Sequence, residues 1–141
     1  MLKSRKKAFM SILTIVLAVF MSCAVFADNH HDSSFNFTFS GGFADRTEFR
    51  GKTNNTSVYM KTTSVEKQFV AHVVGSAKCI YDPYDMGIDC SHGYTYTVSA
   101  PCVYRMYNWV HENSLNYAAI YAAPSYNILS DAHGVWSPDS I

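Results

Sequence analysis

The chain has 141 residues and no net formal charge, but its charges are unevenly distributed. The first 27 residues hold four basic and no acidic side chains, so the rest holds seven basic and eleven acidic ones, a net charge of −4. This mild acidity argues against nucleic acid and anionic lipid as partners, because both favour clustered Lys and Arg, and against a basic membrane-lytic peptide.

Residues 1–27 have the order of a secretory signal peptide: a basic head, a short apolar run and a small-residue tail. We expect cleavage after Ala27, which places Val25 and Ala27 at the positions that require small residues. Cleavage after Ala24 is the weaker alternative, and an uncleaved membrane anchor is a third. The sequence thus predicts a secreted, extracellular protein, residues 28–141, with no stable membrane association after cleavage. The basic residues of the head are Lys3, Arg5, Lys6 and Lys7.

Residues 28–141 are expected to form a single domain. They contain all ten Tyr and both Trp of the chain but only two Leu, so β-branched and aromatic residues outnumber straight-chain helix formers. Short apolar or alternating stretches bounded by turn residues predict an all-β fold, an antiparallel β-sandwich of about seven short strands. The expected strands lie at 34–40, 57–62, 69–74, 94–98, 117–123 and 134–136.

The segment 103–110 fits two interpretations. Val103, Met106 and Val110 fall at helical spacing, whereas an outward Arg105 fits the alternation of a strand. The density of aromatic residues favours the strand.

Secretion would permit disulfide bonds. Cys23 would leave with the signal peptide, so three cysteines remain. We expect Cys79 to pair with Cys90, because the residues between them are rich in turn formers and would bring the two together. The alternative is a bond between Cys90 and Cys102. Either pairing leaves one thiol, which we expect to be buried and inert in preference to forming a dimer.

No catalytic motif is present, and we do not expect an enzyme. Cys102 could serve as a nucleophile only beside a general base, and no local sequence signature places one there. No Gly-x-Ser-x-Gly motif occurs either. The histidines that could reach Cys102 in space are His72, His92, His111 and His133.

Two sets of residues raise the question of a metal. Asp82, Asp85 and Asp89 could offer oxygen ligands to calcium, but their spacing does not match a regular calcium loop, and aspartates in turns usually accept backbone hydrogen bonds. Cleavage after Ala27 would make His30 the third residue of a free N-terminus. Its imidazole, the α-amine and two amide nitrogens would then form the square-planar site that Cu(II) and Ni(II) prefer. We expect no resident cofactor.

The abundance of Tyr and Trp suggests a binding surface. Such rings can stack on sugars, although sandwich cores also use Tyr and Trp with the polar tip reaching solvent. The partners we consider are therefore a cell-wall glycan or a surface protein.

Several stretches resemble a family of small secreted proteins of Gram-positive bacteria that is classed as a domain of unknown function. The most distinctive of them is the tail Trp-Ser-Pro-Asp. The resemblance implies export, a compact β domain and no assigned activity, and it places none of the cysteines. The stretches are 35–39, 59–61, 107–113 and 134–140.

Composition and resemblance together favour a secreted, noncatalytic β-sandwich protein that binds at the cell surface or outside the cell. The alternative is a bacteriocin-like or toxin-like secreted effector. A growth-inhibition assay on related strains distinguishes the two.

Overall fold

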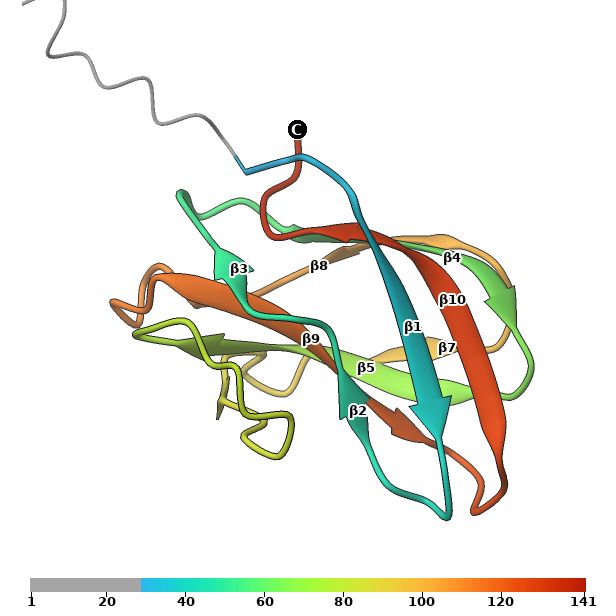
Figure 1. Ribbon diagram of the computed structural model, residues 1–141. Coiled ribbons are helices and arrows are strands. Elements are labelled where there is room, and N and C mark those ends of the chain that lie inside the picture. Colours follow the sequence, from blue (N-terminus) through green and yellow to red (C-terminus); the bar gives the residue numbers. More distant parts are fainter. Residues whose placement is uncertain (1–28) are drawn as a thin grey trace, which may run out of the picture.

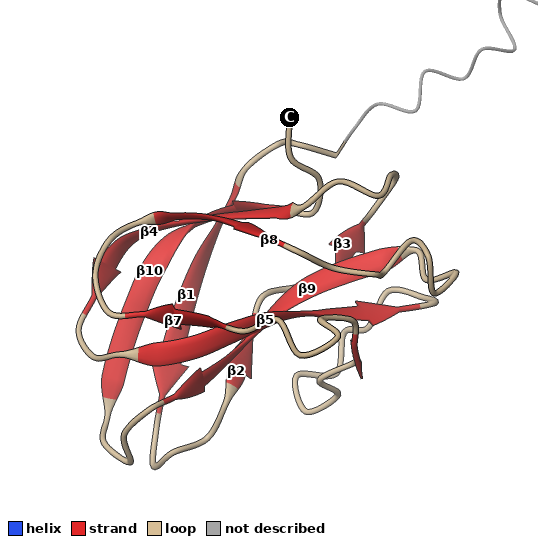
Figure 2. Cartoon of the chain, turned by 180° about the vertical axis from the view of Figure 1, so that it is seen from behind, coloured by secondary structure: helices blue, strands red, loops and turns tan. Residues whose placement is uncertain are grey.

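The computed structural model describes residues 29–141, and these form two antiparallel sheets packed face to face, with no helix (Figures 1 and 2). The predicted signal peptide, with Cys23 and the cut points after Ala24 and Ala27, lies outside the described residues. No helix that is long and apolar enough to span a bilayer occurs in the described part of the chain.

The first sheet has the strand order β1-β10-β4-β8, with every pair antiparallel. In the second sheet, β9 and β5 are central: β2 and β3 pair with the outer edge of β9, and β6 and β7 pair with the outer edge of β5. The strands of the first sheet are β1 (Ser33–Phe39), β4 (Val58–Val65), β8 (Val103–Met106) and β10 (Ser130–Ser137). Those of the second are β2 (Asp45–Arg46), β3 (Arg50–Gly51), β5 (Phe69–Ser76), β6 (Ile88–Asp89), β7 (Tyr96–Val98) and β9 (Tyr117–Pro124).

The prediction of an antiparallel sandwich is confirmed. The longer strands β1, β4, β5, β7, β8, β9 and β10 overlap the predicted stretches, although β10 begins four residues before the predicted 134–136 and β7 begins two residues after the predicted start at 94. Strands β2, β3 and β6 have two residues each, too few to show a period.

Strand β1 illustrates how alternation builds the core. Phe35, Phe37 and Phe39 point inward and are buried, while the polar residues between them are exposed. Phe37 meets Phe69 of β5 edge-on, with ring centroids 5.8 Å apart, so these two rings join the sheets. Burying one such ring stabilises the fold by about 1.5–3 kcal/mol.

A bulge in β4, with Thr63 as the extra residue, interrupts the pairing of β4 with β10. The register between β10 and β4 shifts at His133 and Gly134. A Cβ at Gly134 would collide with the Lys61 carbonyl and the Phe35 ring, so only glycine fits. The bulge therefore depends on one residue type at one position.

The segment 103–110 is a strand in its first half and irregular in its second, up to the turn that begins at Val110. Strand β8 ends at Met106, and the chain turns from Val110 onward. Both side chains are fully buried in the main core. Val103, the third residue at this helical spacing, is 49% exposed, so the three do not form one buried face and no helix is present here.

Candidate functional site

Four aromatic side chains gather at the surface between the β6–β7 loop and the segment that follows β8. The His92 imidazole lies flat on the Trp109 indole, with centroids 4.3 Å apart and planes within 4°. Tyr94 stacks beside Trp109 at 5.8 Å and contacts Tyr107 at 5.4 Å. Tyr94 is 51% and Tyr107 59% exposed. We call His92, Tyr94, Tyr107 and Trp109 the aromatic ridge.

The backbone holds His92 in an unusual conformation. Its φ is 49°, in the left-handed region that few residues other than glycine adopt, although His is enriched among them. Gly93 follows with φ 86°, and the Tyr94 N–H donates to the Ser91 carbonyl at 2.9 Å. The tight turn places the imidazole and the Tyr94 ring on Trp109 together.

The turn is held by Asp89, which precedes it. One Asp89 carboxylate oxygen accepts the Ser91 N–H at 2.8 Å. Burial by itself raises the pKa of Asp89, but the hydrogen bonds from Ser91 and the nearby His72 and His92 outweigh it, so the pKa lies below its ordinary value. Because Asp89 stays ionised in neutral solution, it is an acceptor that fixes the start of the ridge.

Trp109 is anchored from the other side of the ridge. The backbone N–H of Trp109 donates to the Cys90 carbonyl at 2.9 Å, which ties the segment after β8 to the β6–β7 loop. The neighbouring Asn108 is buried, and its side chain donates to the Thr56 carbonyl at 3.1 Å. Hydrogen bonds to backbone carbonyls therefore hold this part of the ridge in place without a ligand.

Two further tyrosines close the gap between the edge strands beneath the ridge. The Tyr96 hydroxyl on β7 donates to the Arg105 carbonyl at 3.4 Å and accepts the Tyr107 N–H at 2.8 Å. The Tyr104 hydroxyl on β8 donates to the Thr97 carbonyl at 3.4 Å, and burial raises the pKa of Tyr104. We call Tyr96 and Tyr104 the tyrosine seal.

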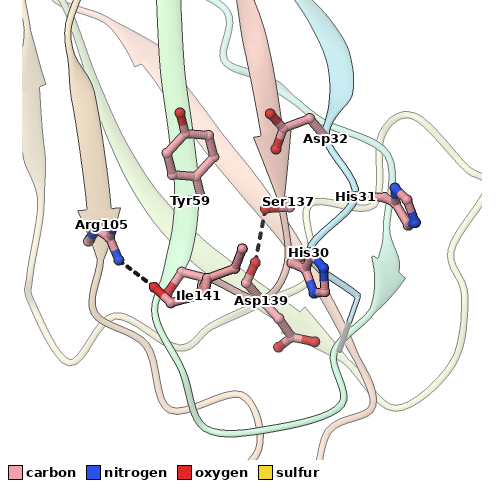
Figure 3. Close-up of a pocket in the computed structure, with 9 residues that line it drawn as sticks. His30, His31, Asp32, Tyr59, Arg105, Ser137, Asp139 and Ile141 are labelled. Atoms are coloured by element: carbon pink, nitrogen blue, oxygen red, sulfur yellow. Dashed lines mark hydrogen bonds between the residues drawn. The ribbon is translucent and has the colours of Figure 1, made fainter. Parts of the chain in front are cut away.

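A second candidate is a cavity of about 330 Å³ between the N-terminal arm and the C-terminal tail (Figure 3). Arg105 donates to the Ile141 main-chain oxygen at 2.7 Å on one side of it. Its lining residues are His30, His31, Asp32, Tyr59, Arg105, Ser137, Asp139, Ser140 and Ile141.

A buried ion pair lies under this cavity. Lys52 and Asp139 are both fully buried, with Nζ and Oδ1 2.9 Å apart, and Nζ also donates to the Thr56 and Pro138 carbonyls at 2.7 and 2.8 Å. The second Asp139 oxygen accepts the Thr53 N–H and hydroxyl at 3.1 and 2.8 Å. The Asp of the Trp-Ser-Pro-Asp tail thus joins the tail to the β3–β4 loop.

Burial by itself raises the pKa of Asp139, but hydrogen bonds from Lys52 and Thr53 and the Lys52 charge outweigh it, so the pKa is lowered. The pair is therefore ionised and internally satisfied, which makes it a structural element.

His30 is exposed at the rim of this cavity. The neighbouring Asn29 N–H donates to the Asp139 carboxylate at 3.1 Å, and its side-chain amide donates to the Gly51 carbonyl at 2.7 Å. The predicted copper site would need the Asn29 amide nitrogen in its deprotonated form, which would place a negative nitrogen against a carboxylate. Copper binding at His30 therefore requires this N-terminal arm to detach, and the site stays a prediction.

The three loop aspartates act on their own turns, as the turn interpretation predicted. Each accepts a hydrogen bond from the backbone N–H two residues later: Tyr84 to Asp82 at 2.9 Å, Gly87 to Asp85 at 3.0 Å, and Ser91 to Asp89. Among residues 29–141, no group of three or more His, Cys, Asp or Glu side chains is placed to hold a metal ion.

The predicted Cys79–Cys90 disulfide is wrong for this structure, in which Cys79, Cys90 and Cys102 are all free thiols. Cys90 is buried in the core between the sheets, whereas Cys79 packs with Phe49 and Val74 on the outer face of the second sheet. The sheet separates the two side chains, so their short distance along the chain does not bring the thiols together.

The described residues give no geometric support to the hypothesis that a histidine activates Cys102 as a nucleophile. Cys102 is exposed ahead of β8, with its Sγ 3.7 Å from the Val103 carbonyl oxygen. Two of the candidate bases are engaged elsewhere, since His92 stacks on Trp109 and His72 lies against Tyr121 at 4.7 Å. Burial lowers the pKa of His72.

Comparison with known proteins gives a family and no activity. Residues 23–140 match the family model described as "Protein of unknown function (DUF2712)". Searches of curated proteins and of solved structures find no match. Since the match spans most of the chain, the protein belongs to the DUF2712 family.

Proposed function

We propose that the protein is secreted and noncatalytic, and that its aromatic ridge binds a glycan of the cell wall by stacking on sugar rings. The observation that carries this proposal is the ridge itself: Tyr94 and Tyr107 each expose more than half of their surface beside Trp109. The C–H groups on one face of a pyranose carry slight positive charge, and the faces of aromatic rings carry slight negative charge, so the two surfaces attract.

The ridge is also held in place before any ligand arrives. Trp109 is pinned to Cys90, and Tyr107 is pinned through its N–H to the Tyr96 hydroxyl of the tyrosine seal. A platform that does not have to be ordered on binding keeps more of its contact energy as affinity.

Polar groups at the ends of the ridge would form hydrogen bonds with the hydroxyls of the sugar. Asp89 lies at the base of the turn, and Glu112 and Asn113 follow Trp109 on an exposed turn. A neutral glycan is favoured over an anionic one, because residues 28–141 carry a net negative charge.

The test is a sedimentation assay of the purified protein with insoluble cell-wall polysaccharides and peptidoglycan. Trp109→Ala and the double variant Tyr94→Ala/Tyr107→Ala should each weaken binding about tenfold, the equivalent of about 1.4 kcal/mol. Tyr84→Ala and Tyr126→Ala are matched controls, since these tyrosines are 88% and 54% exposed away from the ridge. Binding that survives loss of the ridge, or no binding to any of the polymers, would contradict the proposal.

A further inference from the structure

One edge of the first sheet is open. Strand β1 hydrogen-bonds to β10 on one side, and no described strand pairs with its other side (Figure 1). The Thr38 N–H points to that open side, where it donates to the Asp45 carboxylate at 3.0 Å. Because these groups alternate along a strand, the N–H and C=O of Ser34 and Asn36 point the same way as those of Thr38. They border a cavity of about 530 Å³ lined by residues 33–36 and 46–48.

The other edges of the sandwich are protected. The tyrosine seal covers β7 and β8, and β6 has two residues. The chain has three residues between β2 and β3 where β9 has two, which makes a bulge. At this bulge the Thr47 hydroxyl accepts the Ile120 N–H at 2.9 Å. Strand β1 has seven residues without a charge, a proline or a bulge against β10, so the strand itself lacks the devices that keep an edge from pairing. The Asp45 carboxylate caps this edge at Thr38 and leaves Ser34 and Asn36 open.

We propose that a second copy of this chain pairs with the open edge, β1 against β1 and antiparallel, about a two-fold axis beside Phe35. In this register Ser34 of one copy lies opposite Asn36 of the other, so the outward N–H and C=O groups of both strands satisfy one another. The result is one continuous sheet through both sandwiches.

Charge favours a second copy as the occupant. Residues 28–141 carry a net charge of −4, so most approaches of two copies are repulsive, but β1 has no charged residue. The charged residues that line the groove, Arg46 and Glu48, have opposite signs and flank Thr47. The Arg46 guanidinium donates to the Asp82 and Asp85 carbonyls of its own chain, so it is not free to oppose the pairing. In this register Asp32 of one copy lies opposite Thr38 of the other, beside Asp45, so like charges meet only at the two ends of the paired strands.

The experiment is light scattering on the purified protein over a concentration series into the high micromolar range, with its N-terminal residue determined by sequencing. The variant Ser34→Lys/Asn36→Lys and the variant Ser34→Glu/Asn36→Glu place like charges opposite each other across the two-fold axis. Both positions are exposed, so folding is retained and is checked by circular dichroism. The control pair is Asn36→Lys against Ser64→Lys, an exposed position on β4 inside the same sheet.

The wild type and Ser64→Lys should form a dimer, Asn36→Lys should shift it toward monomer, and each double variant should be monomeric. An equal mixture of the lysine and glutamate variants should regain the dimer mass, because opposite charges then face each other. A wild type that stays monomeric overturns the proposal. A lysine double variant that dimerises like the wild type also overturns it. So does a mixture that stays monomeric, even if the edge binds an extended peptide of another protein.

Discussion

The two lateral sides of the sandwich, where the edge strands of the sheets lie, are held together by different interactions. On the side of β7 and β8, the neutral Tyr96 and Tyr104 reach across and bond the backbone of the opposite strand. On the side of β1, β2 and β3, charged groups hold the two ends: the Lys52–Asp139 pair near the start of β1 and Asp45 near its end. The middle of β1 is left free.

This difference separates two tasks. The tyrosine seal supports an exposed aromatic platform that has to keep its shape, so its bonds are neutral and run directly between the sheets. The ionic side ties together the N-terminal arm, the β3–β4 loop and the tail, which are far apart along the chain. One side of the molecule is therefore built to present a surface, and the other holds the ends together while leaving an edge accessible.

The strongest way to break the ionic side is Asp139→Ala. Removing one member of a fully buried pair leaves the other charge without its counter-ion, which costs about 3–5 kcal/mol. Urea unfolding should show this loss in the free energy of unfolding. Replacing both partners, as in Lys52→Met/Asp139→Leu, should recover most of it. If Asp139→Ala unfolds like the wild type, the pair is not what holds the tail.

The same pair predicts that stability depends on pH. The folded protein lowers the pKa of Asp139, so the contribution of Asp139 to stability is fully present above its unfolded pKa, about 3.9, and is lost as the pH falls through the folded value. The free energy of unfolding should thus decrease below about pH 4. Asp139→Asn is the control, because its curve should be flatter there. Equal slopes in the two proteins would show that other carboxylates govern acid unfolding.

Much of this fold follows from the sequence, and the exceptions have physical reasons. The alternation at Phe35, Phe37 and Phe39 predicts β1, because a period of two places every second side chain in the core. Strands β2, β3 and β6 are invisible to this reasoning, since pairing across the sheet defines them. The cysteine prediction failed because separation along the chain does not say on which face of a sheet a side chain lies.

The candidate site was predictable in kind but not in place. The excess of Tyr and Trp indicates an aromatic surface, yet many tyrosines are exposed, including Tyr81 and Tyr84. The ridge is selected by the bond from the Trp109 N–H to Cys90, which brings two distant loops together. The left-handed turn at His92 also has little sequence signal beyond the Gly that follows it.

On the neutral side, Tyr96→Phe should have a moderate effect. It removes the hydroxyl that the Tyr107 N–H donates to, and the net cost of such a bond is about 0.5–1.5 kcal/mol. The larger change should be local: faster hydrogen exchange at the Tyr107 amide and weaker glycan binding, because the ridge loses its support. Tyr104→Phe is the comparison, since its hydroxyl bonds Thr97 away from the ridge residues. An unchanged exchange rate at Tyr107 would separate the seal from the ridge.

The smallest expected effect on stability comes from Asp45→Ala. This variant tests directly whether the side of β1 leaves an edge open for pairing. Asp45 accepts the Thr38 N–H on the open side of β1 and, with its other oxygen, the Arg46 N–H at 2.7 Å. These bonds lie near the surface, so their loss should lower the free energy of unfolding by about 1 kcal/mol. Self-association should instead increase, because the variant frees one more N–H at the edge and removes a negative charge beside it. Light scattering should therefore show a dimer at lower protein concentration than in the wild type. A dimer that weakens with Asp45→Ala would mean that the two copies meet on another surface.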